Sequence, residues 1–169
     1  MYIALLDQDL TIASHEEALQ LHENGHAQWN VLSISDKVVL ERPRFPDARR
    51  VTHLLFDDVE SDSAVDGHYA ATPEDVRSAI SFSRQIGNEP LLIHCYAGIS
   101  RSTAIAWLVA YDRLKERPDA VRRAFEIVRE LRPMMHPNRH VLMVGLDLLV
   151  PSGRRDEVEQ LFLECLSEL

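Results

Sequence analysis

Residues 91–103 read Leu-Leu-Ile-His-Cys-Tyr-Ala-Gly-Ile-Ser-Arg-Ser-Thr, and this stretch decides how the chain folds. It begins as a short apolar run bordered by Pro90, which is typical of a buried strand. It leads into the apolar segment 104–114, which predicts a buried helix. The connecting loop therefore lies at a strand-to-helix turn. Backbone N–H groups and the positive end of a helix dipole point to one place there, and they attract anions.

Cys95 and Arg101 are separated by five residues. A loop of this length can curl so that its successive N–H groups surround a tetrahedral oxyanion. Cys95 would then lie below a bound phosphorus atom, and the planar fork of Arg101 would hold two phosphate oxygens. Gly98 can adopt positive φ, and the Ser102 hydroxyl can donate a hydrogen bond to the thiolate. The predicted phosphate loop (P-loop) comprises Tyr96, Ala97, Gly98, Ile99, Ser100 and Arg101.

The motif His94-Cys95-x-x-Gly98-x-x-Arg101-Ser102 resembles the signature of the cysteine-dependent protein tyrosine phosphatases. The form Ala-Gly-Ile-Ser-Arg-Ser at 97–102 is most similar to the dual-specificity subgroup, in a compact, prokaryotic-like version. The resemblance runs from about residue 51 to 149 and includes the Pro137-Asn138 turn. It implies a fold in which the cysteine loop joins a central strand to a helix.

The resemblance also implies a general acid, an Asp on a loop that follows a strand a few tens of residues before the cysteine. Asp58 fits best, because it comes shortly after the apolar run 51–56 and lies 37 residues before Cys95. The alternatives in the same region are Asp57, Asp62 and Asp66.

These residues predict hydrolysis of a phosphate monoester, carried by a protein or a small molecule, through a phosphocysteine intermediate. Cys95 attacks phosphorus as the thiolate, while the loop N–H groups and Arg101 stabilise the equatorial oxygens. The Asp protonates the leaving oxygen and then activates water, and no metal or other cofactor is needed. His94 is expected to be buried, bonded to the loop backbone and supportive of the loop. Whether phosphotyrosine alone is accepted, or phosphoserine and phosphothreonine too, stays open.

Other interpretations use the same loop. A phosphoinositide or other non-protein phosphatase would share the mechanism, although the loop contains no Lys. The arginine-rich segment 41–50 is either a basic rim that steers the substrate or a solvated connector. A non-catalytic phosphate-binding module would keep the pocket. A sulfur-transfer or arsenate-reducing enzyme fits less well, because Cys95 lies in mid-chain and its loop ends in Gly-x-x-Arg-Ser.

The composition limits which binding partners and which cell compartment we expect. Of 169 residues, 18 are Lys or Arg and 27 are Asp or Glu, which gives a formal charge of −9. This balance disfavours nucleic acid and stable membrane association, so anion binding must be local. The two cysteines form no disulfide framework or zinc pattern and indicate a reducing, cytoplasmic setting. Cys165 is expected in the core, with a role as partner thiol of oxidised Cys95 as the alternative. No apolar run has the length of a membrane span, and no signal peptide is evident.

The rest of the chain predicts one phosphatase domain over residues 1–169. Its expected fold class is α/β, with a single central mixed sheet flanked by helices, as in phosphotyrosine protein phosphatases. Strands are expected at 2–6, 31–34, 38–40, 51–56 and 91–94. Helices are expected at 15–23, 73–86, 104–114, 121–131, 138–149 and 158–169, two of them opened by the caps Ser14 and Thr72. His22 and His26 have metal-like spacing, but with no third ligand no metal site is expected.

Overall fold

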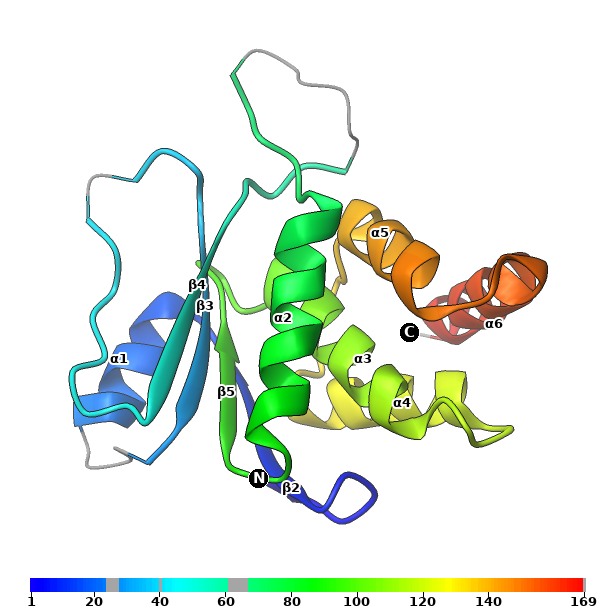
Figure 1. Ribbon diagram of the computed structural model, residues 1–169, viewed down its shortest axis with the longest axis horizontal. Helices are drawn as coiled ribbons and strands as arrows, with labels where there is room; N and C mark the ends of the chain where they lie inside the picture. Colours follow the sequence, from blue (N-terminus) through cyan, green and yellow to red (C-terminus); the bar gives the residue numbers. More distant parts are fainter. Residues whose placement is uncertain (24–27, 40, 61–66, 169) are drawn as a thin grey trace.

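The computed structural model describes residues 1–23, 28–39, 41–60 and 67–168 (Figure 1). These residues form a five-stranded sheet in the order β1-β2-β5-β3-β4. Four strands are parallel, namely β2 (Gln8–Ala13), β3 (Asn30–Ser35), β4 (Arg50–Leu55) and β5 (Leu91–His94). The short β1 (Tyr2–Ile3) pairs antiparallel with β2. The predicted mixed sheet is therefore confirmed, with β5 and its four buried residues in the middle.

The parallel strands bring four segments together. Because parallel strands end at the same edge of a sheet, the residues that follow them gather there. Ser14 follows β2, Asp36 follows β3, Phe56 follows β4 and Cys95 follows β5. This edge is where the predicted phosphate loop begins.

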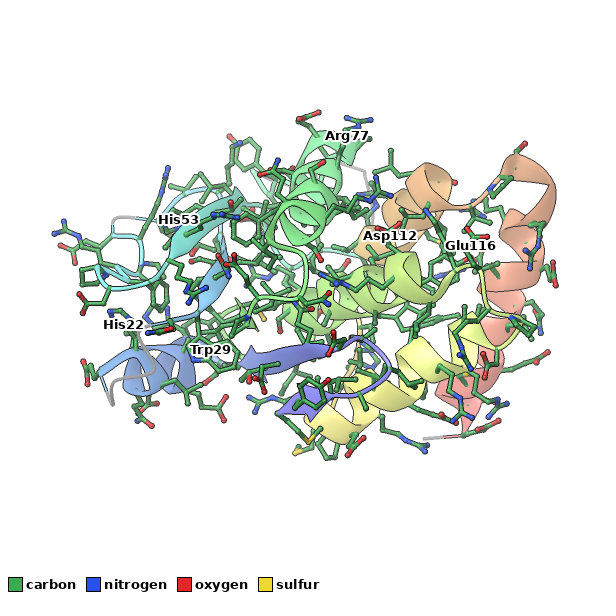
Figure 2. The ribbon with its side chains drawn as sticks, turned by 60° about the horizontal axis from the view of Figure 1, so that its bottom comes forward. His22, Trp29, His53, Arg77, Asp112 and Glu116 are labelled. Carbon is green, nitrogen blue, oxygen red and sulfur yellow. The ribbon has the colours of Figure 1, made fainter. Side chains whose placement is uncertain are left out.

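Helices cover both faces of the sheet (Figure 1). On one face α1 (His15–Glu23) packs over a small apolar cluster, and Figure 2 shows His22 and Trp29 on this side. The other face is covered by α2 (Pro73–Ile86) and α3 (Arg101–Leu114). Against these pack α4 (Ala120–Leu131), α5 (Arg139–Leu149) and α6 (Arg155–Ser167), the last preceded by the 3-10 turn η1 (Ser152–Arg154).

α3 is the central helix, as its apolar sequence predicts. The Trp107 ring stacks on Tyr111 with 5.1 Å between ring centroids and meets Phe162 of α6 edge-on at 4.9 Å. Next to Tyr111, Asp112, labelled in Figure 2, accepts two hydrogen bonds of 2.7 Å from Arg84 of α2. The C-terminal half of α3 is thus held between α2 and α6. Among the described helices, none combines the length and hydrophobicity that crossing a bilayer demands.

Both predicted helix caps are present. The Ser14 hydroxyl accepts from the Glu17 N–H at 3.2 Å, and the Glu17 carboxylate accepts from the Ser14 N–H at 2.7 Å. Thr72 and Asp75 make the same reciprocal pair at the start of α2. These local signals are strong because each satisfies N–H groups that a helix start leaves without intrahelical partners.

One predicted strand is shorter than expected, and another is wrong where the structure describes it. The expected strand 2–6 ends at Ile3, and the chain turns through Asp7 at φ +48° into β2. β2 was not predicted because it opens with Gln8 and Asp9. Gln8 is nevertheless buried, since its side-chain amide donates to the carbonyl oxygens of Gly87 and Glu89 at 3.2 and 2.6 Å.

The expected strand 38–40 is also absent where the structure describes it, and Leu40 lies outside the described residues. The chain leaves the sheet after Ser35 because its next two residues bind elsewhere. Asp36 pairs with Arg101, and the Lys37 N–H donates to Asp57 at 2.9 Å. α3 also starts earlier than expected, at Arg101 instead of Ala104.

Candidate active site

The predicted phosphate loop connects β5 to α3 at the carboxyl edge of the sheet, which is the strand-to-helix turn expected from the sequence. Gly98 has φ +71°, and its N–H donates to the Cys95 Sγ at 3.3 Å. A Cβ at Gly98 would lie 2.6 Å from backbone atoms of Ala13 and Ser14, so space as well as φ requires glycine. The loop therefore curls tightly over the thiol because the β2–α1 junction presses against its outer side.

Cys95 lies at the buried floor of the loop. Its Sγ is hydrogen bonded to the Ser102 Oγ at 3.2 Å, and both side chains are buried. Ser102 stands in the first turn of α3, so the thiol faces the positive end of that helix. When the sulfur is a thiolate, Ser102 and the Gly98 N–H are both donors toward it.

Arg101 is almost fully buried and is held by two other strand ends. Its Nη1 donates to the Asp36 Oδ1 at 2.6 Å and to the Phe56 carbonyl oxygen at 2.9 Å. Its Nε has no hydrogen-bond partner within the described part of the chain and lies 3.9 Å from the Asp58 Oδ2. Arg101 therefore keeps a donor available while the rest of the guanidinium is fixed.

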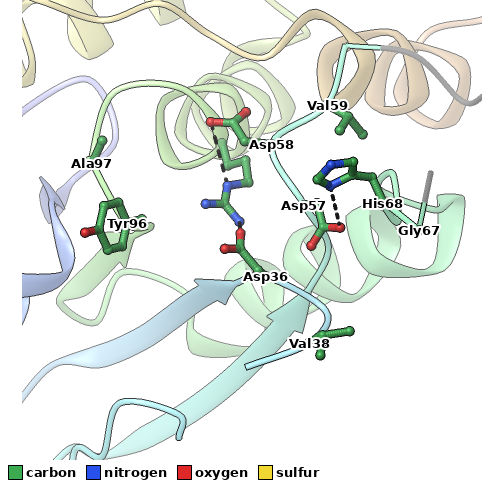
Figure 3. Close-up of a pocket in the computed structure, with 10 residues that line it drawn as sticks. Asp36, Val38, Asp57, Asp58, Val59, Gly67, His68, Tyr96 and Ala97 are labelled. Carbon is green, nitrogen blue, oxygen red and sulfur yellow. Dashed lines mark hydrogen bonds and ion pairs between the residues drawn. The ribbon is translucent and has the colours of Figure 1, made fainter. Parts of the chain in front are cut away.

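Arg101 lines a cavity of about 620 Å³. Figure 3 shows the carboxylates of Asp36, Asp57 and Asp58 around it, with His68 beside Asp57 and Tyr96 at one side. The Tyr96 side chain is 78% exposed at the cavity mouth, and Ala97 lines the same wall. The cavity brings together Cys95's loop, Arg101 and the acid candidates that the structure describes.

The two neighbouring acids have different surroundings. The Asp58 Oδ1 accepts from the Ser100 Oγ at 2.6 Å and from the Asn138 Nδ2 at 2.8 Å, so its carboxyl faces the phosphate loop. Its side chain is 40% exposed, which leaves access to the cavity. Ser100 thereby links the loop to the acid.

The Asp57 carboxylate is hydrogen bonded to two backbone N–H groups. Its Oδ1 accepts from the Lys37 N–H at 2.9 Å, and its Oδ2 accepts from the Tyr69 N–H at 2.8 Å and pairs with His68 at 3.4 Å. Partial burial pushes the pKa of the Asp57 carboxyl upward, but these donors outweigh it and leave the pKa below its ordinary value. A carboxylate held in this way is a poor proton donor. The other two candidates, Asp62 and Asp66, lie outside the described residues.

Asn138 completes the acid's surroundings, and its role was missed from the sequence. It caps α5 by accepting from the Val141 N–H at 2.9 Å, while its Nδ2 donates to Asp58 and, at 3.1 Å, to the Val59 carbonyl oxygen. The side chain is fully buried. The Pro137-Asn138 turn was the available signal, since Asn after Pro favours a helix cap.

A second support reaches the loop from outside. The Arg132 Nε donates to the Gly98 carbonyl oxygen at 3.0 Å, and its two Nη groups contact the Glu17 carboxylate at 3.0 and 2.5 Å. The hydrogen bond from Arg132 is the main reason that the pKa of Glu17 falls to about 2. Nothing in the sequence links Arg132 to Glu17, which lies 115 residues away.

His94 is buried as expected, but its environment differs from the prediction. Neither ring nitrogen makes a well-aligned hydrogen bond among the described residues, although the Cys95 backbone interacts with the ring. The ring packs instead against Phe45 and His15, at centroid distances of 5.3 and 6.1 Å. Burial lowers the pKa of His94 to about 4, which keeps the ring neutral beside the thiol.

The remaining sequence candidates lie apart from the cavity. Cys165 is buried in α6, which packs on α4 and α5, and burial raises the pKa of its thiol. Arg42 and Arg44 line a different cavity, of about 590 Å³, and Arg50 begins β4 at the edge of the sheet opposite Cys95. His26 lies outside the described residues, and no metal-binding cluster of three His, Cys, Asp or Glu side chains occurs within those that are described.

The comparisons with known proteins agree with this geometry. The family model for protein-tyrosine phosphatase matches residues 19–149. Among solved structures, OH1 from the Orf virus, described as a tyrosine phosphatase with triple substrate specificity, is 18% identical with a TM-score of 0.61. That match covers 88% of this chain and 86% of that chain. Human DUSP28 is 17% identical with a TM-score of 0.58, covering 89% and 93%.

A further likeness is to PTPMT1 in complex with PI(5)P, at 12% identity and a TM-score of 0.55, covering 90% of this chain and 93% of that chain. At these identities the structural matches show the fold. None of the curated proteins matches the chain. The family match spans most of the sequence and includes Asp58, Cys95 and Arg101. The chain therefore belongs to the cysteine-based protein-tyrosine phosphatase family and has the fold of its dual-specificity members.

Proposed function

We propose that this protein removes phosphate from tyrosine, and from serine or threonine, side chains of proteins through a phosphocysteine intermediate on Cys95. One observation carries the proposal. The Cys95 sulfur is hydrogen bonded to Ser102 and the Gly98 N–H at the base of a loop whose Tyr96, Ala97 and Arg101 line the cavity, and the Arg101 Nε has no hydrogen-bond partner in the described chain. A nucleophile and an anion-binding group thus belong to one loop beside the cavity.

In the first step the Cys95 thiolate attacks phosphorus and the ester oxygen leaves. The loop N–H groups and Arg101 stabilise the three equatorial oxygens, which is the electrostatic contribution expected to dominate. Asp58 gives its proton to the leaving oxygen, so that a neutral alcohol or phenol departs. Its contacts with Ser100 and Asn138 support this role, because they hold the carboxyl beside the loop.

In the second step water attacks the phosphocysteine. The Asp58 carboxylate takes a proton from that water, and the sulfur leaves as a thiolate that accepts from Ser102 and the Gly98 N–H. Inorganic phosphate is the product, and Asp58 is again protonated for the next cycle. A reduced thiol is required throughout, which favours a cytoplasmic location. We treat residues 1–169 as one phosphatase domain.

The test is hydrolysis of an aryl phosphate against pH, without added metal. Cys95→Ser should lose essentially all activity. Asp58→Asn should lose about 100-fold or more in kcat and flatten the basic limb of the pH profile. Asp57→Asn serves as the matched control and should retain that limb. If Asp58→Asn keeps the wild-type profile, Asp58 is not the acid. If Cys95→Ser stays active, the cysteine mechanism is wrong.

A phosphoinositide substrate is the second candidate, favoured by the fold likeness to PTPMT1. It uses the same Cys95 chemistry, so the two candidates differ only in what the cavity mouth accepts. Comparing phosphate release from phosphotyrosyl peptides and from phosphoinositide vesicles at matched concentration separates them. A non-catalytic binding module predicts no turnover of either.

A further inference from the structure

The mouth of the Arg101 cavity is unusually rich in carboxylates for a site that must admit a phosphate dianion. Three Asp residues line it, at positions 36, 57 and 58, and Arg101 is the only Lys or Arg among its described lining residues. That one arginine is already paired with Asp36 at 2.6 Å. Even with Asp58 protonated for catalysis, the lining has two carboxylates, those of Asp36 and Asp57, against one arginine before any substrate binds.

The cations that could offset this charge are directed elsewhere. Arg42 and Arg44 line the separate cavity near Phe45. Arg139, next to Asn138, is turned to Glu159 at 3.3 Å. Lys37 lines a neighbouring cavity of about 450 Å³, which shares His68 with the first. A second phosphate beside the first would meet carboxylates at this mouth.

Asp36 is the acid best placed to meet a substrate. Its side chain is 55% exposed, and only its Oδ1 contacts Arg101, so the carboxylate can also accept a donor from the cavity. Val38, which is 80% exposed, lines the same mouth, and Figure 3 shows it on the side opposite Tyr96. An open mouth with apolar flanks and an exposed carboxylate fits a peptide that carries a cation next to its phosphate.

The buried Nε–H of Arg101 is the group in this cavity that can bind the phosphate. Arg101 lines the cavity, and its buried Nε lacks a hydrogen-bond partner in the described chain. A phosphate oxygen would satisfy it. The site thus combines one anion-binding point with a surrounding ring of negative charge.

We propose that the Arg101 cavity selects singly phosphorylated protein segments with Lys or Arg beside the phosphorylated residue, and that Asp36 binds this cation. The inference rests on the proposed function and adds its substrate class. Like-charge repulsion disfavours acidic flanks and polyphosphorylated headgroups, whereas an exposed ion pair with Asp36 favours basic flanks. Because the groups are solvent-accessible, the preference should weaken with salt.

The experiment compares three phosphotyrosyl peptides of equal length, with Lys, Gln or Glu on both sides of the phosphotyrosine. For the wild type at low salt, kcat/KM should be about fivefold or more higher with Lys than with Glu, with Gln between them. In 0.5 M salt the ratio should fall toward one. Asp36→Asn should compress the low-salt ratio in the same way, whatever it does to absolute rates.

Asp156→Asn is the matched control. It removes one negative charge from a fully exposed side chain in α6, away from the cavity, and should keep the wild-type ratio. Equal kcat/KM for the three peptides, a preference for Glu, or faster turnover of a polyphosphorylated inositol headgroup than of the Lys peptide would overturn the proposal. An unchanged ratio in Asp36→Asn would exclude Asp36 as the binding group.

An aryl phosphate without flanking residues separates this inference from the proposed function. If it is hydrolysed in a Cys95-dependent way while the peptides do not differ, only the charge selection fails. If it is not hydrolysed, the proposed function itself fails.

Discussion

Arg132 donates from its Nε to the carbonyl oxygen of Gly98 at 3.0 Å, so a residue beyond the end of α4 fixes the outer side of the phosphate loop. Glu17 of α1 holds the Arg132 guanidinium from the other side. The loop is thus supported at its tightest point by two segments that contribute nothing to the cavity lining. Removing the support should change the geometry of the loop without altering its chemistry.

We expect Arg132→Ala to lower kcat on an aryl phosphate about 10- to 100-fold, because a small displacement of the loop N–H groups weakens their hold on the transferring phosphoryl group. Glu17→Gln, which keeps a neutral acceptor for Arg132, should lose less. Arg123→Ala, an exposed arginine of α4 paired with Asp119 and Glu126, is the control and should retain wild-type kcat. Equal activity of Arg132→Ala and wild type would show that the loop holds its shape unaided.

Gly98→Ala should cost both activity and stability. The new Cβ would meet the backbone at Ala13–Ser14 and would also sit at positive φ, so we expect a loss of a few kcal/mol in unfolding free energy. Two other glycines separate these causes. Gly87 has φ +58° but open space around a Cβ, so Gly87→Ala reports strain alone. Gly153→Ala has open space and no positive φ and should be neutral. Urea unfolding of the three variants measures these losses. If Gly98→Ala loses no more unfolding free energy than Gly87→Ala, the close approach of Gly98 to the Ala13–Ser14 backbone has no energetic effect.

The buried His94 predicts a pH dependence of stability. Its pKa is about 4 in the folded protein against an ordinary 6.5, so between these values the unfolded chain takes up a proton that the folded protein does not. Stability is therefore fully present above pH 6.5 and falls as the pH is lowered toward 4, by about 3 kcal/mol at most. Urea unfolding at pH 7, 5.5 and 4.5 should show this slope in wild type and a shallower one in His94→Asn. Parallel slopes in the two proteins would mean that other groups cause the loss.

Asn138→Ala should act on catalysis through Asp58. Loss of the 2.8 Å hydrogen bond removes one of the two side-chain donors that orient the Asp58 carboxyl, and we expect kcat to fall about tenfold on a substrate with a poor leaving group. An activated aryl ester, which needs little protonation, should be affected less. Stability should also fall by about 1 kcal/mol, because Asn138 caps α5.

The double variant tests whether Asn138 works through Asp58. If it does, Asn138→Ala adds little to the kcat loss already caused by Asp58→Asn. Fully additive losses would instead assign Asn138 a separate role. Asn138→Asp separates the helix cap from the contact with Asp58. It retains an acceptor for the Val141 N–H but brings a second carboxylate against Asp58.

Sequence patterns predicted the parts of this protein that depend on neighbours along the chain. The apolar run at 91–94, the Cys95–Arg101 spacing and the Ser14 and Thr72 caps each involve interactions within a few residues. The family resemblance, rather than a local interaction, limited the candidates for the general acid to a short segment. Choosing between Asp57 and Asp58 required knowing that Lys37 and Tyr69 present their N–H groups to the first, and Ser100 and Asn138 their side chains to the second.

The misses have one physical cause, which is pairing between distant segments. β2 begins with the polar residues Gln8 and Asp9, and Gln8 is buried only because it finds carbonyl oxygens some 80 residues away. Val38 follows a strand but leaves the sheet because Asp36 is drawn to Arg101. Periodicity and composition carry no information about contacts between distant segments, so local sequence patterns do not predict these pairings.

The contacts that hold Gly98 also affect when, during synthesis, the protein can become active. The backbone that presses on Gly98 is made early, at Ala13 and Ser14, whereas Arg132 and Asn138 are among the later residues to emerge from the ribosome. Contacts of such long sequence separation form late in folding, because much of the intervening chain must first be ordered. We therefore expect a nascent chain that ends before Arg132 to have low activity, because its Cys95 loop lacks the contacts from Arg132 and Asn138.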